Sequence, residues 1–487
     1  MKRIIALLLS VCTMLCFAAC ADTAGTVTSN TTSTSNTTAI SNTTSTSGTT
    51  ASTSGTTSAT SSPGTSDAEK INFGGHKFTF AIDINSVYGY EVGGEGVSGE
   101  AIYQPIRSRN KEIETLYNCK IKTDYIGNGT LENDFNTNKS TIDVVCSAGA
   151  HRSVDRYIEL NTLDIDFSTD WWMGSFMKES AMDGKNFYTI CYGSLSAFET
   201  TQVIIFNKTL KNGNEAVKDI DFYGLVSNNE WTLDKFSEIV KLSAVDADNN
   251  GTIETYNDDI YGLMSDTKFT PTSFYFGAGG RFSNNVVAPD GTYYFSPAID
   301  STAELLTDKI ISIYADSSAT WSSDVMLIYE MKNGKTMFVT DEIYRLRNYS
   351  GTDIGILPFP KGEAADSYVS YSENNMYAIS VPKTCTDLDR ISKFLDIYAK
   401  HSKETVYPEF KKWIASKADG ENTEKMLDHI FENLASDPAQ RHNFASLYSD
   451  YPTSVTDGEN LFKDNKSEIN EAMLRSAANH IQGMVRP

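Results

Sequence analysis

One stretch of the chain carries the spacing of a calcium-binding loop. Its oxygen-bearing side chains recur at alternate positions, namely Asp246, Asp248, Asn250, Thr252 and Glu254. Hard cations such as Ca²⁺ prefer oxygen ligands, which EF-hand loops supply at this spacing around a sharp glycine turn. Gly251 takes the turn position, and Ile253 takes the buried eighth position. The pattern predicts a structural calcium ion.

The end of this loop departs from the EF-hand pattern. Its twelfth position is Asn257 in place of the bidentate glutamate, so the last metal ligand would have to be Asp258 or Asp259. We take Asp258 as the closing ligand. The alternative is an Asp- and Asn-rich surface turn that binds no metal.

The spacings of common catalytic sites are missing from the sequence. Its six histidines show no HExxH pattern, and it has no GxSxG elbow, phosphate-binding loop or dinucleotide fingerprint. Carboxylates are so numerous that a pair suited to glycoside hydrolysis could be imagined anywhere, so such a pair carries no weight. We therefore expect no enzyme activity and no catalytic cofactor.

Length and charge narrow the class of protein. The chain has 487 residues and a net charge of −22. A chain of this length is too long for one ordinary hydrophobic core, so we expect two or more globular units. Nucleic acid is a poor partner, because phosphate binding needs clustered cations. The acidity fits an extracytoplasmic protein, which we expect to be monomeric.

The first 66 residues have the composition of an export signal and a tether. A basic start and an apolar run make residues 1–19 a secretory signal peptide. The run ends in Phe-Ala-Ala before Cys20, which resembles a bacterial lipobox with Phe where Leu is preferred. A lipid on Cys20 would anchor the protein to the outer face of the cell membrane. The alternative is cleavage after Ala19 and release. The Ser- and Thr-rich residues 20–66 predict a disordered stalk.

The four remaining cysteines are Cys119, Cys146, Cys191 and Cys385. They are far apart and show no CxxC or zinc spacing. Export permits disulfides, but three of the four lie in apolar, strand-like runs, which favours buried free thiols.

The folded body begins near Lys70 with alternating strand and helix patterns. Strand-like runs at 76–82, 119–126 and 142–146 surround an amphipathic helix pattern at 102–117. This alternation predicts a three-layer α/β lobe with a largely parallel sheet.

The remaining elements follow in a less regular order. Thr232 can cap a helix that runs to Leu242, and a second helix pattern covers 301–314. An aromatic, glycine-rich turn is predicted at 274–280, and residues 387–485 read as mostly helical. Short strands are predicted at 260–264, 335–339, 354–358 and 376–382.

The stretch from Asp183 to Leu210 looks like a connection between two lobes. It combines a turn, a short strand at 187–192, a loop of small residues and a second strand at 203–206. We expect Cys191 and Tyr192 to lie at the crossing. Ligand pockets favour such interfaces between domains.

These features, taken in order, match a family pattern. The landmarks are the lipobox and stalk, Asp183-Gly184-Lys185, Asn207-Lys208, Trp231-Thr232-Leu233-Asp234, Gly279-Gly280, residues 334–338, residues 355–361 and residues 377–380. With them the chain resembles extracellular solute-binding proteins of ABC importers, in the sugar-binding group related to maltose-binding protein.

The resemblance implies a two-lobed, periplasmic-binding-protein-like (type II) fold, with three-layer α/β/α lobes joined by a hinge. Lobe 1 would comprise residues 67–190 and 373–405, and lobe 2 residues 191–370 and 406–487. The implied function is capture of a carbohydrate, such as an oligosaccharide, and its delivery to ABC permease subunits in the membrane. The alternatives are a secreted carbohydrate-active enzyme, or a surface sensor or adhesin on the same fold.

The resemblance also places strand ends and loops at the cleft. Sugar sites there combine aromatic faces with polar groups that fix the hydroxyls. The implied ligand-binding residues are Asp83, Asn85, His151, Trp172, Tyr192, Phe198, Tyr275, Trp321, Tyr344, Arg345, Tyr371, Glu373 and Asn374. For any single aromatic residue, core packing is the alternative. Trp171 and Trp172 cannot both face one side of an extended segment, and Trp231 is expected to be structural.

Overall fold

Two β-sheets, each accompanied by helices, organise the described part of the chain. The computed structural model describes residues 71–83, 87–95, 100–126, 136–137, 141–148, 154–255, 257–289, 293–372 and 376–485. The chain divides after Ser66, and all of these residues belong to the second unit, Asp67–Pro487. The predicted signal peptide, Cys20 and the stalk therefore lie outside the described residues.

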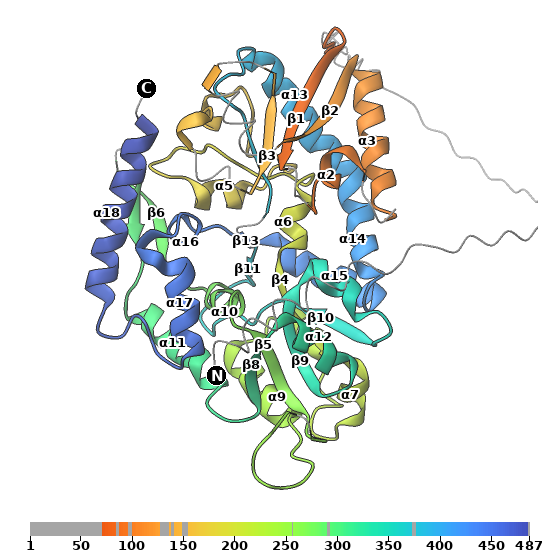
Figure 1. Cartoon of the computed structure of the whole chain (residues 1–487), viewed down its shortest axis with the longest axis vertical. Helices are drawn as coiled ribbons and strands as arrows, with labels where there is room; N and C mark the ends of the chain where they lie inside the picture. Colours follow the sequence, from red (N-terminus) through yellow and green to blue (C-terminus); the bar gives the residue numbers. More distant parts are fainter. Residues whose placement is uncertain are drawn as a thin grey trace, which may run out of the picture. The chain divides into compact units, whose positions relative to one another are not determined.

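The first sheet has the strand order β12-β3-β1-β2, of which Figure 1 labels β3, β1 and β2 side by side. Its strands are β1 (His76–Asp83), β2 (Cys119–Ile126), β3 (Val144–Ser147) and β12 (Ala378–Ser380). β1 runs parallel to β2 and β3, while β12 is antiparallel to β3. The largely parallel sheet predicted from the sequence is confirmed.

Helices α3 (Tyr103–Leu116) and α13 (Leu388–His401) bury one apolar face each beside the first sheet. Ile106 and Ile113 of α3 are fully buried, because their spacing of seven residues returns to the same helix face. The rings of Phe78 on β1 and Phe394 on α13 stack at 3.6 Å. This contact fixes α13, which is distant in sequence, against the start of the chain's folded part.

The second sheet has the order β10-β4-β9-β5-β8. Its strands are β4 (Gln202–Asn207), β5 (Tyr261–Asp266), β8 (Ala319–Ser322), β9 (Thr336–Glu342) and β10 (Ile354–Leu357). β5 is parallel to β8 and β9, whereas β4 is antiparallel to both of its neighbours. Every residue of β4 is buried, as expected for a strand enclosed on both faces.

Four of the helices between residues 208 and 332 begin at side-chain caps. Asn207 caps α7, Asp221 caps α8, Thr232 caps α9 and Asp300 caps α11, each accepting backbone N–H groups of the first turn. The helices are α7 (Lys208–Gly213), α8 (Phe222–Ser227), α9 (Leu233–Ser243), α10 (Thr270–Gly277), α11 (Ser301–Ile313) and α12 (Asp324–Lys332). Trp231 is fully buried and donates its indole N–H to the Pro358 carbonyl at 2.9 Å, which confirms its structural role.

The C-terminal part is mostly helical, as predicted. It contains α14 (Tyr407–Ala415), α15 (Gly420–Glu432), α16 (Pro438–Arg441), η6 (Phe444–Ser446), α17 (Leu447–Thr456) and α18 (Lys466–Val485). Two small sheets accompany it, formed by β6 (Ser283–Val287) with β7 (Tyr293–Pro297), and by β11 (Ser370–Tyr371) with β13 (Leu434–Ala435). None of the described helices is long and apolar enough to cross a membrane.

Three segments connect the two sheet regions. The first is α6 (Leu195–Glu199), which leads into β4, and the second lies between β11 and β12, where the structure describes Ser372, Met376 and Tyr377. The third is the π-helical segment η5 (Ser402–Val406) between α13 and α14. The predicted lobe boundaries remain a prediction, but β1, β2, β3 and β12 do share one sheet, and β4, β5, β8, β9 and β10 form the other.

Three details of the sequence predictions have clear outcomes. Residues 187–192 form no regular strand; only the isolated bridges Thr189–Ile379 and Trp172–Cys191 occur there. The predicted turn at 274–280 begins inside helix α10, every residue of which is buried. The four cysteines are free and buried, as predicted.

Candidate binding site

The carboxyl-end edges of the two sheets meet at the three connections. β1 and β3 end at Asp83 and Ser147, and β5, β8 and β9 end at Asp266, Ser322 and Glu342. Ligands of open α/β sheets bind outside such strand ends. The ring of Tyr88, which follows β1, contacts the ring of Tyr344, which follows β9, with centroids 5.6 Å apart. The two edges therefore face one another.

Three tyrosines form the aromatic part of this contact. Tyr88 meets Tyr344 edge-on, at 75°, and also meets Tyr377 at 6.0 Å and 80°. Tyr377 directly precedes β12, whose antiparallel start lies at the same edge as the end of β3. Tyr344 belongs to the helical turn η4 (Ile343–Tyr349), and it is the one of the three that is only half-buried. Its ring is thus the accessible aromatic surface of the trio.

A stacked pair of rings occupies the end of β8. Trp321 is half-buried and stacks on Tyr314 at 3.7 Å with an interplanar angle of 17°. The Tyr314 hydroxyl donates to the Ser265 hydroxyl at 2.7 Å, which holds the supporting ring in place. An indole backed on one face in this way presents a preorganised flat surface, of the kind that covers the C–H face of a sugar.

Carboxyl groups surround these rings at the edge of the second sheet. Asp266 accepts hydrogen bonds from the backbone of Lys268 and Phe269 and from the Thr270 hydroxyl. Asp341 accepts a hydrogen bond from the Tyr349 hydroxyl at 2.7 Å. Burial raises the pKa of Asp266 and brings the pKa of Asp341 to about 8. Asp341 is therefore largely protonated at neutral pH.

Arg345 supplies the positive charge of this edge. Its guanidinium group contacts Asp324 at 2.6 Å and Asp341 at 3.3 Å. Asp324 is the first residue of α12, and its side chain is 49% exposed. The edge therefore combines flat rings with fixed donors and acceptors, which suits a polyhydroxylated ligand.

The structure brings several of the predicted ligand-binding residues to these edges. Trp321, Tyr344 and Arg345 lie at the second sheet, and Asp83 is the last residue of β1. Asn85, His151, Glu373 and Asn374 lie outside the described residues.

Four other predicted residues are packed in the core, so their placement is corrected. Phe198 and Tyr275 are fully buried, and Tyr371 and Trp172 are 2% and 3% exposed. Tyr275 stacks on Phe282 at 4.9 Å, and Phe198 lies 4.7 Å from Phe431. The sequence shows the aromatic residue but not which neighbours enclose it.

The two adjacent tryptophans differ in burial. Trp172 is buried and Trp171 is half-buried, and both donate their indole N–H groups to the same Asp396 oxygen. Trp172, which was predicted to face the ligand, is therefore the inward-facing one.

Tyr192 lies between two of the connections. It is half-buried, its ring lies 4.5 Å from that of Tyr407, and the Lys403 ammonium lies 5.0 Å from its centroid. The segment that leads into the second sheet is α6, a few residues later than expected. Cys191 itself is buried in the apolar cluster of the first sheet.

Sequence reasoning missed Tyr88, Tyr377, Tyr314, Asp266, Asp324 and Asp341. Asp266 and Asp341 each fall at the carboxyl end of a buried strand, which is the signal that could have found them. Tyr88 and Tyr377 follow no comparable pattern, because long-range packing brings them together.

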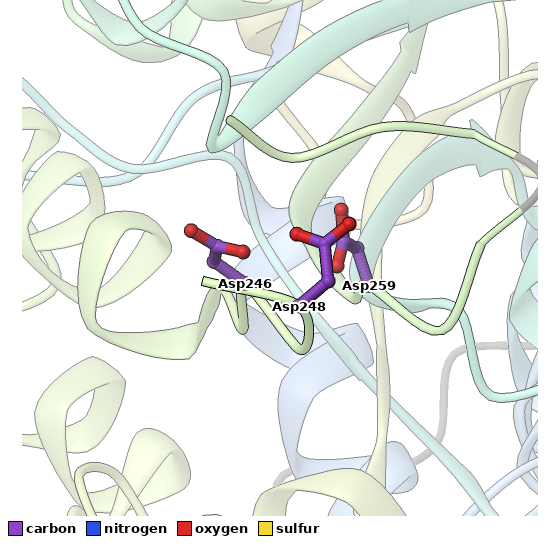
Figure 2. Close-up of side chains that lie close together, drawn as sticks. All are labelled: Asp246, Asp248 and Asp259. Atoms are coloured by element: carbon purple, nitrogen blue, oxygen red, sulfur yellow. The ribbon is translucent and has the colours of Figure 1, made fainter. Parts of the chain in front are cut away.

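The predicted calcium loop gathers three carboxylates (Figure 2). Asp246, Asp248 and Asp259 place one oxygen each within 4.8 Å of the others. Asp246 accepts hydrogen bonds from the backbone N–H groups of Asn250 and Gly251, at 3.1 and 2.7 Å. The sharp turn predicted at Gly251 is present, with a φ of 89°.

The predicted closing ligand is corrected by the structure. The Asp258 side chain is 98% exposed and pairs with Lys335 at 3.2 Å, away from the carboxylate group. Asp259 is 2% exposed and accepts the backbone N–H groups of Ala247 and Glu254. These two bonds draw the two ends of the loop together around the Asp259 carboxylate.

No family model and no curated protein matches the sequence. Solved structures do match. A sugar transporter from Rhizobium etli, in an open conformation, is 14% identical, covers 82% of this chain and 99% of its own, and has a TM-score of 0.54. A family 1 extracellular solute-binding protein from Bifidobacterium longum subsp. infantis is 11% identical, covers 83% and 100%, and has a TM-score of 0.52.

The chain has the fold of a two-lobed solute-binding protein. A third structure, M. tuberculosis UspC, agrees, with 13% identity, coverage of 82% and 100%, and a TM-score of 0.52. Identities this low speak for the fold alone. The predicted two-lobed α/β fold is thereby confirmed.

Proposed function

We propose that the protein is the substrate-binding lipoprotein of an ABC importer and that it captures a carbohydrate between its two lobes. The observation that carries this proposal is the pair of facing sheet edges lined by Tyr344, the backed indole of Trp321 and the Asp324–Arg345 pair. Two of the structural neighbours are named as a sugar transporter and a family 1 solute-binding protein, which supports the same class. Bound ligand would bridge both lobes and favour their closed arrangement.

A thermal-shift screen over mono- and oligosaccharides tests the substrate class. A ligand that binds only the folded state raises the melting temperature by mass action. We expect a shift with at least one carbohydrate and its loss in Trp321→Ala. No shift with any sugar, together with a shift for peptides or polyamines, would overturn the class.

The two alternative functions predict different measurements. A carbohydrate-active enzyme would release reducing sugar over time from a ligand found in the screen, whereas a binding protein would return it unchanged. A sensor or adhesin would bind the same ligand but would not stimulate ATP hydrolysis by a reconstituted importer.

The same proposal includes attachment through a lipid at Cys20. It is supported by the lipobox-like sequence before that residue. Labelling of cells with a radioactive fatty acid should mark the wild-type protein and leave Cys20→Ala unlabelled. Equal labelling of both would contradict lipidation at this residue.

We also propose a structural calcium ion in the loop of Asp246, Asp248 and Asp259. Three carboxylate oxygens at mutual distances below 4.8 Å, with Asn250 and Thr252 beside them, match the oxygen preference of Ca²⁺. Calorimetry of chelator-treated protein should show heat on addition of Ca²⁺. The absence of any heat would remove calcium from the proposal.

A further inference from the structure

The three connections between the sheet regions enclose two buried glutamates. Glu199 ends α6 and is fully buried, and Glu91 lies in the short helix α2 (Tyr90–Gly93) with 2% exposure. α2 follows β1 of the first sheet, whereas Glu199 stands directly before β4 of the second. Carboxyl groups are rarely buried this deeply without specific partners.

Glu199 is held from both sides. The Tyr90 hydroxyl of α2 donates to its Oε2 atom, and the Arg347 guanidinium of η4 donates to its Oε1 atom at 2.6 Å. Tyr90 belongs to the region of the first sheet, and Arg347 follows β9 of the second. The set Tyr90–Glu199–Arg347, here called the clasp, therefore joins the two lobes at their connection.

Arg347 extends the clasp to the candidate binding site. Its guanidinium carbon lies 4.0 Å from the ring centroid of Tyr344 and 5.3 Å from that of Trp413. The Trp413 indole N–H donates to Glu100 at 3.1 Å. The position of Tyr344, the accessible ring of the tyrosine trio, thus depends on where Arg347 is held.

Glu91 lies beside the clasp and is bound to the same connection. One of its oxygens accepts the Ser196 backbone N–H at 2.8 Å. Arg109 of α3 donates to the Ser402 hydroxyl at 3.0 Å and to the carbonyl of Val92 at 3.0 Å, which ties α2 to the third connection. The charged and titratable groups that face Glu199 are Tyr90, Glu100 and Arg347, and those that face Glu91 are Glu199, Tyr90, Arg109, Cys146, Cys191 and Tyr398.

Both carboxyl groups titrate near physiological pH. Burial raises the pKa of Glu199 to about 7, although the Tyr90 hydroxyl and Arg347 lower it, and burial raises the pKa of Glu91 to about 8. The charge on Glu199, and with it the strength of its ion pair, therefore changes within the range that an extracytoplasmic protein meets.

We propose that the clasp is a proton-controlled lock on the hinge. Ionised Glu199 holds Tyr90 and Arg347 together and keeps the lobes in the arrangement of this structure. Protonation of Glu199 releases Arg347, and the ring of Tyr344 moves with it. The lock itself stands on the hinge geometry. Its effect on ligand affinity rests on the proposed function.

The test measures the distance between the lobes without any ligand. Fluorophores on Lys111→Cys of α3 and Glu238→Cys of α9, in the full chain with Cys12, Cys16 and Cys20 each replaced by alanine, report this distance by energy transfer. The four native thiols are at most 6% exposed and stay unlabelled in the folded protein. In the protein with wild-type clasp residues, the mean distance between the two fluorophores should change between pH 5.5 and 8.5, with a midpoint near pH 7.

Two substitutions separate the lock from general structural damage. Glu199→Gln, which cannot ionise, should show the low-pH distance at every pH. Tyr90→Phe should move the midpoint to higher pH, because the hydroxyl donates to the ionised form. If Glu199→Gln does not fold, Arg347→Gln tests the lock in its place, because it should also show the low-pH distance at every pH. Arg390→Gln, which breaks an exposed pair with Asp387, is the control and should titrate like the wild type.

A wild-type distance that does not change with pH, or a Glu199→Gln variant that keeps the wild-type midpoint, would overturn the lock. The ligand arm uses a sugar found in the thermal-shift screen. Its dissociation constant should change between pH 6 and pH 8 in the wild type and stay constant in Glu199→Gln. If no sugar binds at any pH, the proposed function fails while the ligand-free distances still decide the lock.

Discussion

Replacing Glu91 by glutamine should remove part of the pH dependence of stability. The folded protein keeps this carboxyl 2% exposed and brings its pKa from 4.5 to about 8, mainly through burial. The folded state therefore binds a proton that the unfolded state releases above pH 4.5. This contribution to stability is fully present below pH 4.5 and is lost as the pH rises through 8. Its slope is at most about 1.4 kcal/mol per pH unit.

Glutamine keeps the oxygen that accepts the Ser196 N–H and carries no charge at any pH. The free energy of unfolding of Glu91→Gln should therefore lie within about 1 kcal/mol of the wild type at pH 5. By pH 8 the variant should be the more stable protein, by at most about 4 kcal/mol, which is the slope above taken over three pH units. The buried carboxyl of Asp341, which is not among the groups that shift the Glu91 pKa, contributes equally to both proteins and cancels in the difference. Glu199 raises the pKa of Glu91, so its contribution cancels only in part.

Urea unfolding followed by tryptophan fluorescence at pH 5, 6, 7 and 8, at constant ionic strength, measures this difference. Glu215→Gln is the matched control, because its side chain is 85% exposed and the substitution removes the same charge at the surface. Its difference from the wild type should stay nearly constant. Parallel pH curves for Glu91→Gln and the wild type would refute the reasoning from burial.

Three further predictions concern the site, the loop and the hinge. Tyr344→Ala should weaken carbohydrate binding by about tenfold in calorimetry, since a stacked aromatic ring contributes about 1 kcal/mol or more, whereas Tyr329→Ala, 59% exposed on α12, should not. Ca²⁺ at 100 times its dissociation constant should stabilise the chelator-treated protein by about 2.7 kcal/mol; Asp259→Asn should lose this gain, and Asp258→Asn should keep it. Gly193→Ala should lower the free energy of unfolding, measured in urea, by about 1–3 kcal/mol, because its new Cβ would lie 2.6 Å from the Ser402 hydroxyl. In Gly213→Ala the new Cβ meets no atom within 4 Å, so the free energy of unfolding should stay near that of the wild type.

The fold was predictable where the pattern of apolar residues is regular. Helix α3 shows a clear apolar face, and β4 is a short apolar run, so both were assigned within a few residues. Helix α10 was missed because all of its residues are buried and it has no polar face, so helical periodicity gives no signal. The run at 187–192 is apolar but pairs only through single bridges. Apolar sequence indicates burial there and does not determine hydrogen bonding.

The site was predictable in part, and the failures have one physical cause. A strand end can be recognised in sequence, and the segment around Arg345 follows a predicted strand at 335–339. Trp321 was named only through the family resemblance, because no strand was predicted at 319–322. Whether a ring at such an end is enclosed depends on contacts from distant segments. Tyr275, for example, is covered by Tyr451 and Phe462 of the C-terminal region. Asp258 and Asp259 differ by one position in sequence, yet only the backbone path of the loop decides which of them turns inward.

The connections between the lobes combine buried apolar side chains, such as Leu195 and Phe198, with small hydroxyl residues. Thr200 and Ser372 of neighbouring connections are hydrogen-bonded at 3.0 Å, and Ser372 also donates to the Ala197 carbonyl at 2.8 Å. The Tyr377 backbone N–H donates to the Ser196 hydroxyl at 2.9 Å. Interdigitated apolar side chains resist sliding. Short hydroxyl side chains can exchange one backbone partner for another at little cost, since a hydrogen bond is replaced by a similar one.

A few strong interactions span this hinge, and among the described residues the Glu199–Arg347 ion pair is the most deeply buried of these. This pair can therefore bias the choice between lobe arrangements. A ligand that contacts Tyr344 acts on the same arginine from the other side. The hydroxyl groups of the connections and the buried Glu199 carboxylate therefore act together. The hydroxyl groups let the lobes move, and Glu199 lets a proton or a ligand control their arrangement.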